Sequence, residues 1–278
     1  MSRTEFSERM GLKKVDDLKI QLNSMNRRLK SRLWNKVYSN VFMLDLGRYE
    51  YGGSKITYYV WEDYWANEIT SLPKRKETIL GDIKYEWDKM NWENTYNFIQ
   101  FILRYPGTWV PMRDLIEDCN EVLAQEKAGY RIIDSVITPI IDDVEITSVE
   151  ESLKNTDEFE VISEHIRTSM QFLSDRDNPN YRNSIKESIS AVESMCKIIT
   201  KKEKATLGDA LKIIRKDHDI HPALFESFNK LYGYTNDENG IRHSLNDGGV
   251  KIQLTEAKFM LITCSAFVNF LKEKLVEK

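Results

Sequence analysis

Apolar residues recur at helical spacing along most of the N-terminal half of the chain. The clearest stripe lies in residues 24–41, where Met25, Leu29, Leu33, Val37 and Val41 follow one another at every fourth position. This spacing predicts an amphipathic helix, and Ser24 is placed to cap its N-terminus. The same pattern predicts two helices within residues 75–104 and another over 112–127, where Leu115, Cys119, Val122 and Leu123 face inward.

A different pattern follows Gly129. The segment YRIIDSVITPI is rich in β-branched residues and carries Asp134 and Ser135 at its middle. It predicts a short β-hairpin within residues 129–141. Because two strands alone are barely stable, we expect the hairpin to lie on the helices.

Helical spacing returns from about residue 147. Residues 148–174 predict one long helix or a broken pair, and the segment 177–180 then interrupts the chain. Further helices are predicted over 181–200 and 207–216, after Pro222 and over 255–276. In the last helix the residues expected to face the core are Phe259, Ile262, Ala266, Phe267, Phe270 and Leu271.

These elements predict a mainly α protein of two domains: a helical domain with a small hairpin over 1–146 and a helical bundle over 147–278. Among the 278 residues, 12 are glycine and 6 are proline, which favours helices over a loop-rich β fold. The net charge of −4 restricts any nucleic-acid contact to a local patch. Three dispersed cysteines, a charged N-terminus and short apolar runs predict a soluble cytoplasmic protein with no membrane contact.

Sequence motifs exclude several enzyme classes. The chain lacks the glycine-rich motifs of nucleotide-hydrolysing and Rossmann enzymes, the HExxH of zinc proteases and the GxSxG of α/β-hydrolases. Neither a metal nor a cofactor is expected.

The polar segment 235–249 separates two apolar helices and carries Arg242 beside His243. Arginine binds a phosphate with two hydrogen bonds, and histidine exchanges a proton near neutral pH. Together they are the minimum for metal-independent RNA cleavage, in which the 2′-hydroxyl attacks the adjacent phosphorus. The alternative is structural: Arg242 pairs with a carboxylate and His243 fills a helix junction.

A second candidate surface is the basic face of residues 24–41. It carries Arg27, Arg28, Arg32 and Lys36, together with Lys30. These side chains either contact RNA phosphates or form a solvated helix face.

Several long segments resemble bacterial abortive-infection proteins of the AbiJ type. FSERMGLK, LKSRLWNKVY, WEDYW and EVLAQEKAGYRIIDSVITPI resemble the fourth type of AbiJ N-terminal domain. NPNYRNSIKESISAVESMCKIIT, ATLGDALKII, LYGYTNDENGIRHSL and EAKFMLITCSAFVNFL resemble the C-terminal region, whose helical pattern is similar to a HEPN domain, a bundle found in toxins and antiphage RNases.

The HEPN resemblance implies a catalytic pattern of arginine, a polar residue and a later histidine. Arg242 and His243 match the first two positions, whereas Asp247, Gly248 or Gly249 stands where the second histidine is expected. Either His243 takes over acid–base catalysis, or the bundle binds RNA or protein without cutting.

The resemblance further implies an acidic residue on the helix 181–200 that orients Arg242 or His243, and Glu187 is the candidate for it. It also implies a homodimer formed through the C-terminal bundle. It implies a role in defence against phage, with RNA as the partner. The sequence names neither a trigger nor an antitoxin.

Overall fold

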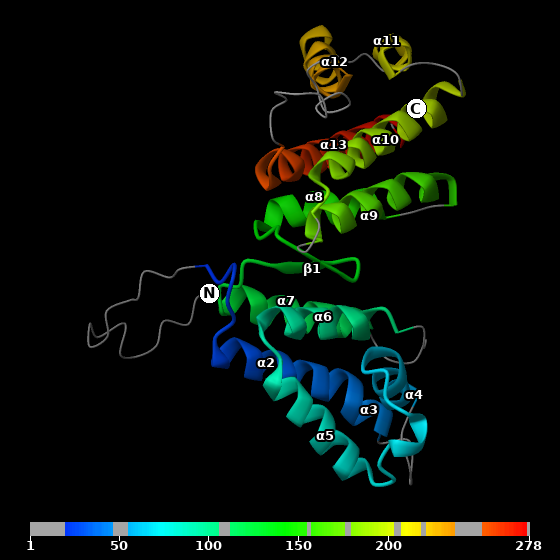
Figure 1. Ribbon diagram of the computed structural model, residues 1–278. Coiled ribbons are helices and arrows are strands. Elements are labelled where there is room, and N and C mark those ends of the chain that lie inside the picture. Colours follow the sequence, from blue (N-terminus) through cyan, green and yellow to red (C-terminus); the bar gives the residue numbers. More distant parts are fainter. Residues whose placement is uncertain are drawn as a thin grey trace, which may run out of the picture. The chain divides into compact units, whose positions relative to one another are not determined.

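The computed structural model describes residues 20–46, 55–105, 112–154, 157–175, 179–202, 207–217, 221–236 and 252–276 (Figure 1). The chain divides into two compact units, residues 1–141 and 142–278. The predicted fold class is confirmed, because helices make up most of the described residues and are accompanied by a two-stranded antiparallel sheet.

The N-terminal unit is a set of short and medium-length helices followed by the hairpin. Its elements are α2 (Arg27–Val37), the π-helical η1 (Tyr38–Phe42), α3 (Met43–Leu46), α4 (Lys55–Tyr58), the π-helical η2 (Tyr59–Tyr64), the 3-10 helix η3 (Ile69–Ser71), α5 (Lys76–Lys89), α6 (Trp92–Leu103), α7 (Met112–Gln125), β1 (Arg131–Ile133) and β2 (Val136–Thr138). The two helices predicted within 75–104 are therefore present as α5 and α6.

The helix predicted over residues 24–41 begins later than expected. Its N-cap is Asn26, whose side-chain oxygen accepts a hydrogen bond of 2.8 Å from the backbone N–H of Leu29. The expectation that Ser24 caps this helix was wrong. The predicted apolar stripe is correct, because Leu29, Leu33, Val37 and Val41 are fully buried.

The core of the N-terminal unit is rich in aromatic rings. Trp87 is 1% exposed, and its ring lies 5.4 Å from that of Trp34 and 5.8 Å from that of Phe98. Trp65, the residue just after η2, stacks on Phe98 at 5.9 Å, so ring contacts join α2, α5, α6 and the end of η2.

The hairpin lies where the sequence predicts it. Asp134 and Ser135 have φ angles of 45° and 65°, as a tight two-residue hairpin turn requires. The Asn120 amide on α7 donates to the Ile132 carbonyl and accepts from the Ile132 N–H, each at 2.8 Å. Gln100 on α6 accepts from the Ile137 N–H at 2.9 Å. Helix side chains thus satisfy backbone groups that two strands alone leave unpaired.

The C-terminal unit is helical throughout its described part. It comprises α8 (Asp143–Leu153), the 3-10 helix η4 (Asp157–Phe159), α9 (Glu160–Ser174), α10 (Tyr181–Thr200), α11 (Leu207–Asp217), α12 (Pro222–Asn236) and α13 (Leu254–Val276). Residues 148–174 therefore form a broken pair, and α10 has the predicted bounds. The boundary predicted at 146/147 falls inside α8, which packs with the second unit against α13 and α9.

Helix α13 differs from the prediction in the face it buries. Phe267 and Leu271 are buried as expected, but Phe259 is 55% exposed and Ala266 is exposed. Apolar residues surround this helix on nearly all sides, so periodicity alone does not select the buried face. By length and composition α13 is the one described helix that could cross a membrane, and its packing against α10, α8 and α9 is that of a bundle's core helix.

Candidate functional site

The predicted Arg242–His243 segment lies outside the described residues. The structure describes the two flanking helices, α12 up to Asn236 and α13 from Leu254. The other predicted catalytic residue, Glu187, is described and lies in the middle of α10.

Glu187 contacts a histidine from the neighbouring helix. Its Oε2 lies 2.7 Å from Nδ1 of His165 on α9. The two side chains are 28% and 30% exposed, so the pair lies at the surface of the helix pair and is reachable from solvent. A carboxylate that binds one ring nitrogen orients the imidazole and leaves Nε2 for a second partner. This is the geometry of an oriented acid–base group.

Sequence reasoning did not single out His165. It lies four residues before the buried Ser169, at the edge of the α9 face that packs on α10. This spacing was the sequence signal that could have identified His165, because residues four apart lie on the same side of a helix.

Buried serine hydroxyls also connect α9 and α10, the two helices that carry His165 and Glu187. Ser169 Oγ donates to the Ser184 carbonyl at 2.8 Å and lies 2.7 Å from Ser188 Oγ. Ser188 Oγ in turn donates to the Ser184 carbonyl at 2.9 Å. Small, hydrogen-bonded residues let the two helices approach closely, so the backbone that carries His165 and Glu187 is well supported.

The basic face of α2 is largely paired within the protein. Arg28 and Arg32 both contact the carboxylate of Glu126, just beyond α7. Lys36 lies 3.1 Å from Asp118 on α7. The carboxyl of Asp118 also accepts from Asn40 at 2.8 Å, and these two donors hold its pKa below the usual value.

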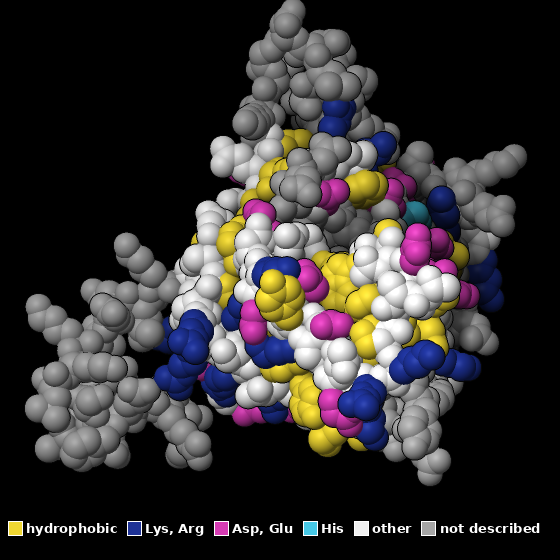
Figure 2. All heavy atoms as spheres, turned by 60° about the horizontal axis from the view of Figure 1, so that its bottom comes forward, with side chains coloured by type: hydrophobic (Ala, Val, Ile, Leu, Met, Phe, Trp, Pro, Cys, Tyr) yellow, Lys and Arg dark blue, Asp and Glu magenta, His cyan; other side chains and the backbone are white. Residues whose placement is uncertain are grey.

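Arg27 differs from the other four cations of this face. Within the part of the chain that the structure describes, it is exposed and makes neither an ion pair nor a hydrogen bond. Figure 2 shows lysine and arginine side chains interspersed with acidic and hydrophobic ones on the side that carries α5. The described residues on this side therefore form no continuous basic surface.

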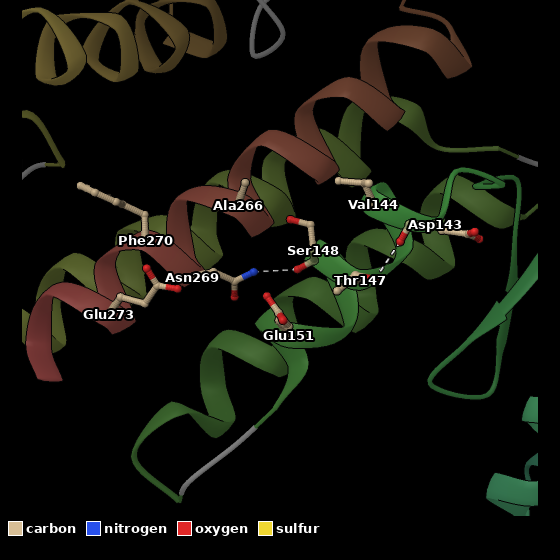
Figure 3. Close-up of a pocket in the computed structure, with 9 residues that line it drawn as sticks. All are labelled: Asp143, Val144, Thr147, Ser148, Glu151, Ala266, Asn269, Phe270 and Glu273. Atoms are coloured by element: carbon tan, nitrogen blue, oxygen red, sulfur yellow. Dashed lines mark hydrogen bonds between the residues drawn. The ribbon is translucent and has the colours of Figure 1, made fainter.

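A groove runs between α8 and α13 (Figure 3). We call it the α8–α13 groove. It is open to solvent, has a volume of about 470 Å³ and is lined by Asp143, Val144, Thr147, Ser148, Glu151, Ala266, Asn269, Phe270 and Glu273. Val144 is 78% exposed. The Asn269 amide donates to the Ser148 carbonyl at 2.8 Å, while Asn269 Oδ1 and Ser148 Oγ are buried without a partner among the described residues.

The three cysteines and His221 are weaker candidates for a functional site. Cys119, Cys196 and Cys264 are buried, and burial raises the pKa of each thiol to about 12. They are therefore unreactive at neutral pH. His221 precedes α12, and its Nδ1 accepts from the Ala223 N–H at 3.2 Å. Among the described residues no group of acids, cysteines and histidines is arranged to hold a metal ion.

The family is shown by comparison with known proteins. The family model described as AbiJ N-terminal domain 4 matches residues 4–155, more than half of the chain. The chain belongs to this family, and the AbiJ domain associates it with abortive infection, a defence against phage. Searches of curated proteins and of solved structures found no match. The matched region includes α8, so the family's sequence pattern continues into the first helix of the second compact unit.

Proposed function

We propose that this abortive-infection protein is a metal-independent endoribonuclease whose C-terminal unit is a HEPN-like bundle. The observation that carries the proposal is the contact of 2.7 Å between His165 and Glu187 at the surface of that unit. Such a pair supplies an oriented proton-transfer group without a metal. The AbiJ domain supplies the defence context in which cleavage of cellular RNA is useful.

The reaction needs two proton transfers. The 2′-hydroxyl of the RNA attacks the adjacent phosphorus and loses its proton to a base. The bond from phosphorus to the 5′-oxygen breaks, and an acid donates a proton to that oxygen. The products are a 2′,3′-cyclic phosphate and a 5′-hydroxyl end.

In this proposal the roles are divided among four side chains. Arg242 holds the phosphate and stabilises its developing charge, because a guanidinium matches phosphate oxygens with two parallel hydrogen bonds. His243 is one proton-transfer group. His165, from α9, supplies the second imidazole in place of the histidine that the HEPN pattern expects after Arg242. Glu187 is the positioning residue for His165.

RNA contacts outside the cleavage site are assigned to the basic face of α2. Arg27, which has no partner among the described residues, is the first cation available to a phosphate. Arg28, Arg32 and Lys36 contribute only when they leave Glu126 and Asp118. We further propose that two copies of the C-terminal unit associate, as the HEPN resemblance implies.

RNA cleavage by the purified full-length protein in EDTA tests this function. The wild type is compared with Arg242→Ala, His243→Ala and His165→Asn, and His221→Asn is the matched control for an exposed histidine. We expect the wild type to leave 2′,3′-cyclic phosphate ends. Each of the three variants should lose activity by about a hundredfold or more, and the control should not.

Two results would refute the proposal. The first is RNA left intact by the wild type. The second is cleavage that His165→Asn leaves unchanged while Arg242→Ala abolishes it, because His165 is then not part of the site.

The alternative is a non-catalytic dimer that binds RNA or protein. The α8–α13 groove favours it, because Val144 is exposed at one end and the apolar Ala266 and Phe270 line its α13 side. Exposed apolar side chains around a groove are typical of an interaction site.

Sedimentation of the wild type and two matched variants tests the dimer. Val144→Glu places a charge in the groove, whereas Val161→Glu places one at a position on α9 that is 54% exposed and does not line the groove. If the groove joins two copies, Val144→Glu alone should produce a monomer. A wild type that is monomeric at high concentration refutes this alternative.

A further inference from the structure

The N-terminal unit contains a hollow of about 680 Å³ where α2 and α6 begin and α5 ends. Its walls include Arg27, Lys30, Lys84, Trp87, Met90 and Trp92, and we call it the cationic hollow. Its volume falls within the range of about 300–1,000 Å³ that is usual for small-molecule sites.

Positive charge predominates in the cationic hollow. Among the described residues, its charged lining consists of Arg27, Lys30 and Lys84 and the carboxylate of Asp88. That carboxylate is already engaged by the Lys84 ammonium one helical turn away. An anion that enters the hollow therefore meets cations without first displacing a free carboxylate.

Each cation contributes differently. The Lys30 ammonium donates to the carbonyls of Asp88 and Met90 at 3.0 and 2.6 Å, so it is fixed at the end of α5. Burial lowers its pKa, and a bound anion would offset this effect. Arg27 has no partner among the described residues, so its five N–H donors are available.

The hollow also has an aromatic wall. Trp92 is half-buried at the first turn of α6, and its ring stacks on Tyr130 at 6.4 Å with an angle of 20° between the planes. Tyr96 meets the same indole edge-on at 6.4 Å. Because these contacts fix the indole, a flat ligand loses little entropy in ordering it.

We propose that the cationic hollow binds a nucleoside phosphate, either free or as the end of an RNA strand. Arg27 pairs with the phosphate, Lys30 and Lys84 contribute positive potential, and the base packs against Trp92. A phosphate alone would leave the aromatic wall unused, and a nucleoside alone would leave Arg27 unpaired. The site belongs to the AbiJ-type unit and is independent of the proposed ribonuclease chemistry.

Isothermal titration calorimetry on the full-length protein tests the proposal. The probes are the four nucleoside 5′-monophosphates, adenosine, inorganic phosphate and a short 5′-phosphorylated RNA. At least one monophosphate or the RNA should bind, and adenosine and inorganic phosphate should each bind at least about tenfold more weakly. Binding of a monophosphate indicates a free nucleotide as ligand, and binding of the RNA alone indicates a strand end. Binding of neither overturns the proposal.

Two neighbouring arginines provide the matched control. Arg27→Gln should weaken binding by about tenfold or more, since it removes the charge-assisted hydrogen bonds to the phosphate. Arg28→Gln removes the same charge from the next residue, which pairs with Glu126 and does not line the hollow. Equal effects of the two variants would show nonspecific attraction and overturn the proposal.

Replacement of Trp92 tests the aromatic wall. Trp92→Leu should weaken nucleotide binding and leave the weak binding of inorganic phosphate unchanged, with circular dichroism confirming the fold. If this variant fails to fold because its contact with Tyr130 is lost, the two arginine variants still decide the question.

Discussion

The two compact units differ in the chemistry of their packing. The N-terminal unit packs tryptophan, tyrosine and phenylalanine rings together, and at one edge it gathers cations and indoles around a hollow. In the C-terminal unit, α9 and α10 are joined through small serine hydroxyls and carry the His165–Glu187 pair at their surface. The first arrangement suits capture of an aromatic anion. The second suits proton transfer between groups held at a fixed distance.

The largest expected effect comes from the aromatic core. Trp87→Ala should lower the free energy of unfolding by about 3–5 kcal/mol, because it removes the ring that contacts both Trp34 and Phe98. Tyr85 is the control on the same helix; it is 62% exposed, and Tyr85→Ala should cost about 0.5 kcal/mol or less. Urea denaturation measures both. Equal losses would show that this aromatic cluster does not stabilise the fold.

The hydroxyl contacts of the C-terminal unit should contribute less. Ser169→Ala removes the hydrogen bond to the Ser184 carbonyl and the contact with Ser188 Oγ. Because Ser188 Oγ still donates to the same carbonyl, the cost should be about 0.5–1.5 kcal/mol. Urea denaturation measures this cost as well. A loss as large as that of Trp87→Ala would contradict the contrast between the two units.

A third test concerns the paired basic face. Glu126→Gln removes the carboxylate that Arg28 and Arg32 share. Loss of this negative charge beside the two arginines should strengthen binding of single-stranded RNA by about threefold at low salt and steepen its salt dependence. Fluorescence anisotropy measures the affinity. Unchanged binding would mean that this face of α2 does not contact RNA.

The smallest effect is a dependence on pH. The hydrogen bond from Asn40 and the nearby Lys36 hold the pKa of Asp118 below its ordinary value of 3.8. The resulting stability is fully present above that value and is lost as the pH falls through the lower pKa of the folded state. Asp118→Asn should therefore cost at most about 1 kcal/mol at pH 7, and the difference should disappear at acidic pH. A difference that persists at low pH would contradict the assignment.

Local sequence patterns predicted the helices and strands better than they predicted which side chains contact one another. The hairpin and α10 follow from the turn residues 134–135 and from a regular apolar stripe. Asn26, and not the predicted Ser24, caps α2. Both residue types cap helices, so the residue at which the helical backbone begins decides between them. On α13 too many faces are apolar for periodicity to select the buried one.

The partners of charged residues depend on tertiary contacts that periodicity does not encode. Glu187 meets His165 across two helices, and Arg28 and Arg32 meet Glu126 from a distant part of the chain. Sequence reasoning identified Glu187 and the basic face as candidates, but it did not reveal that His165 and Glu126 lie beside them. The predicted roles of Arg242 and His243 concern residues outside the described part of the chain.

The most direct test of the account is the rate of RNA cleavage in EDTA by two variants of α10. Glu187→Gln removes the negative charge beside His165, whereas Glu193→Gln removes one from the same helix without disturbing that contact. The account predicts that Glu187→Gln lowers the cleavage rate by about tenfold to a hundredfold and alters its pH profile, while Glu193→Gln behaves as the wild type. Equal rates for the two variants would contradict it.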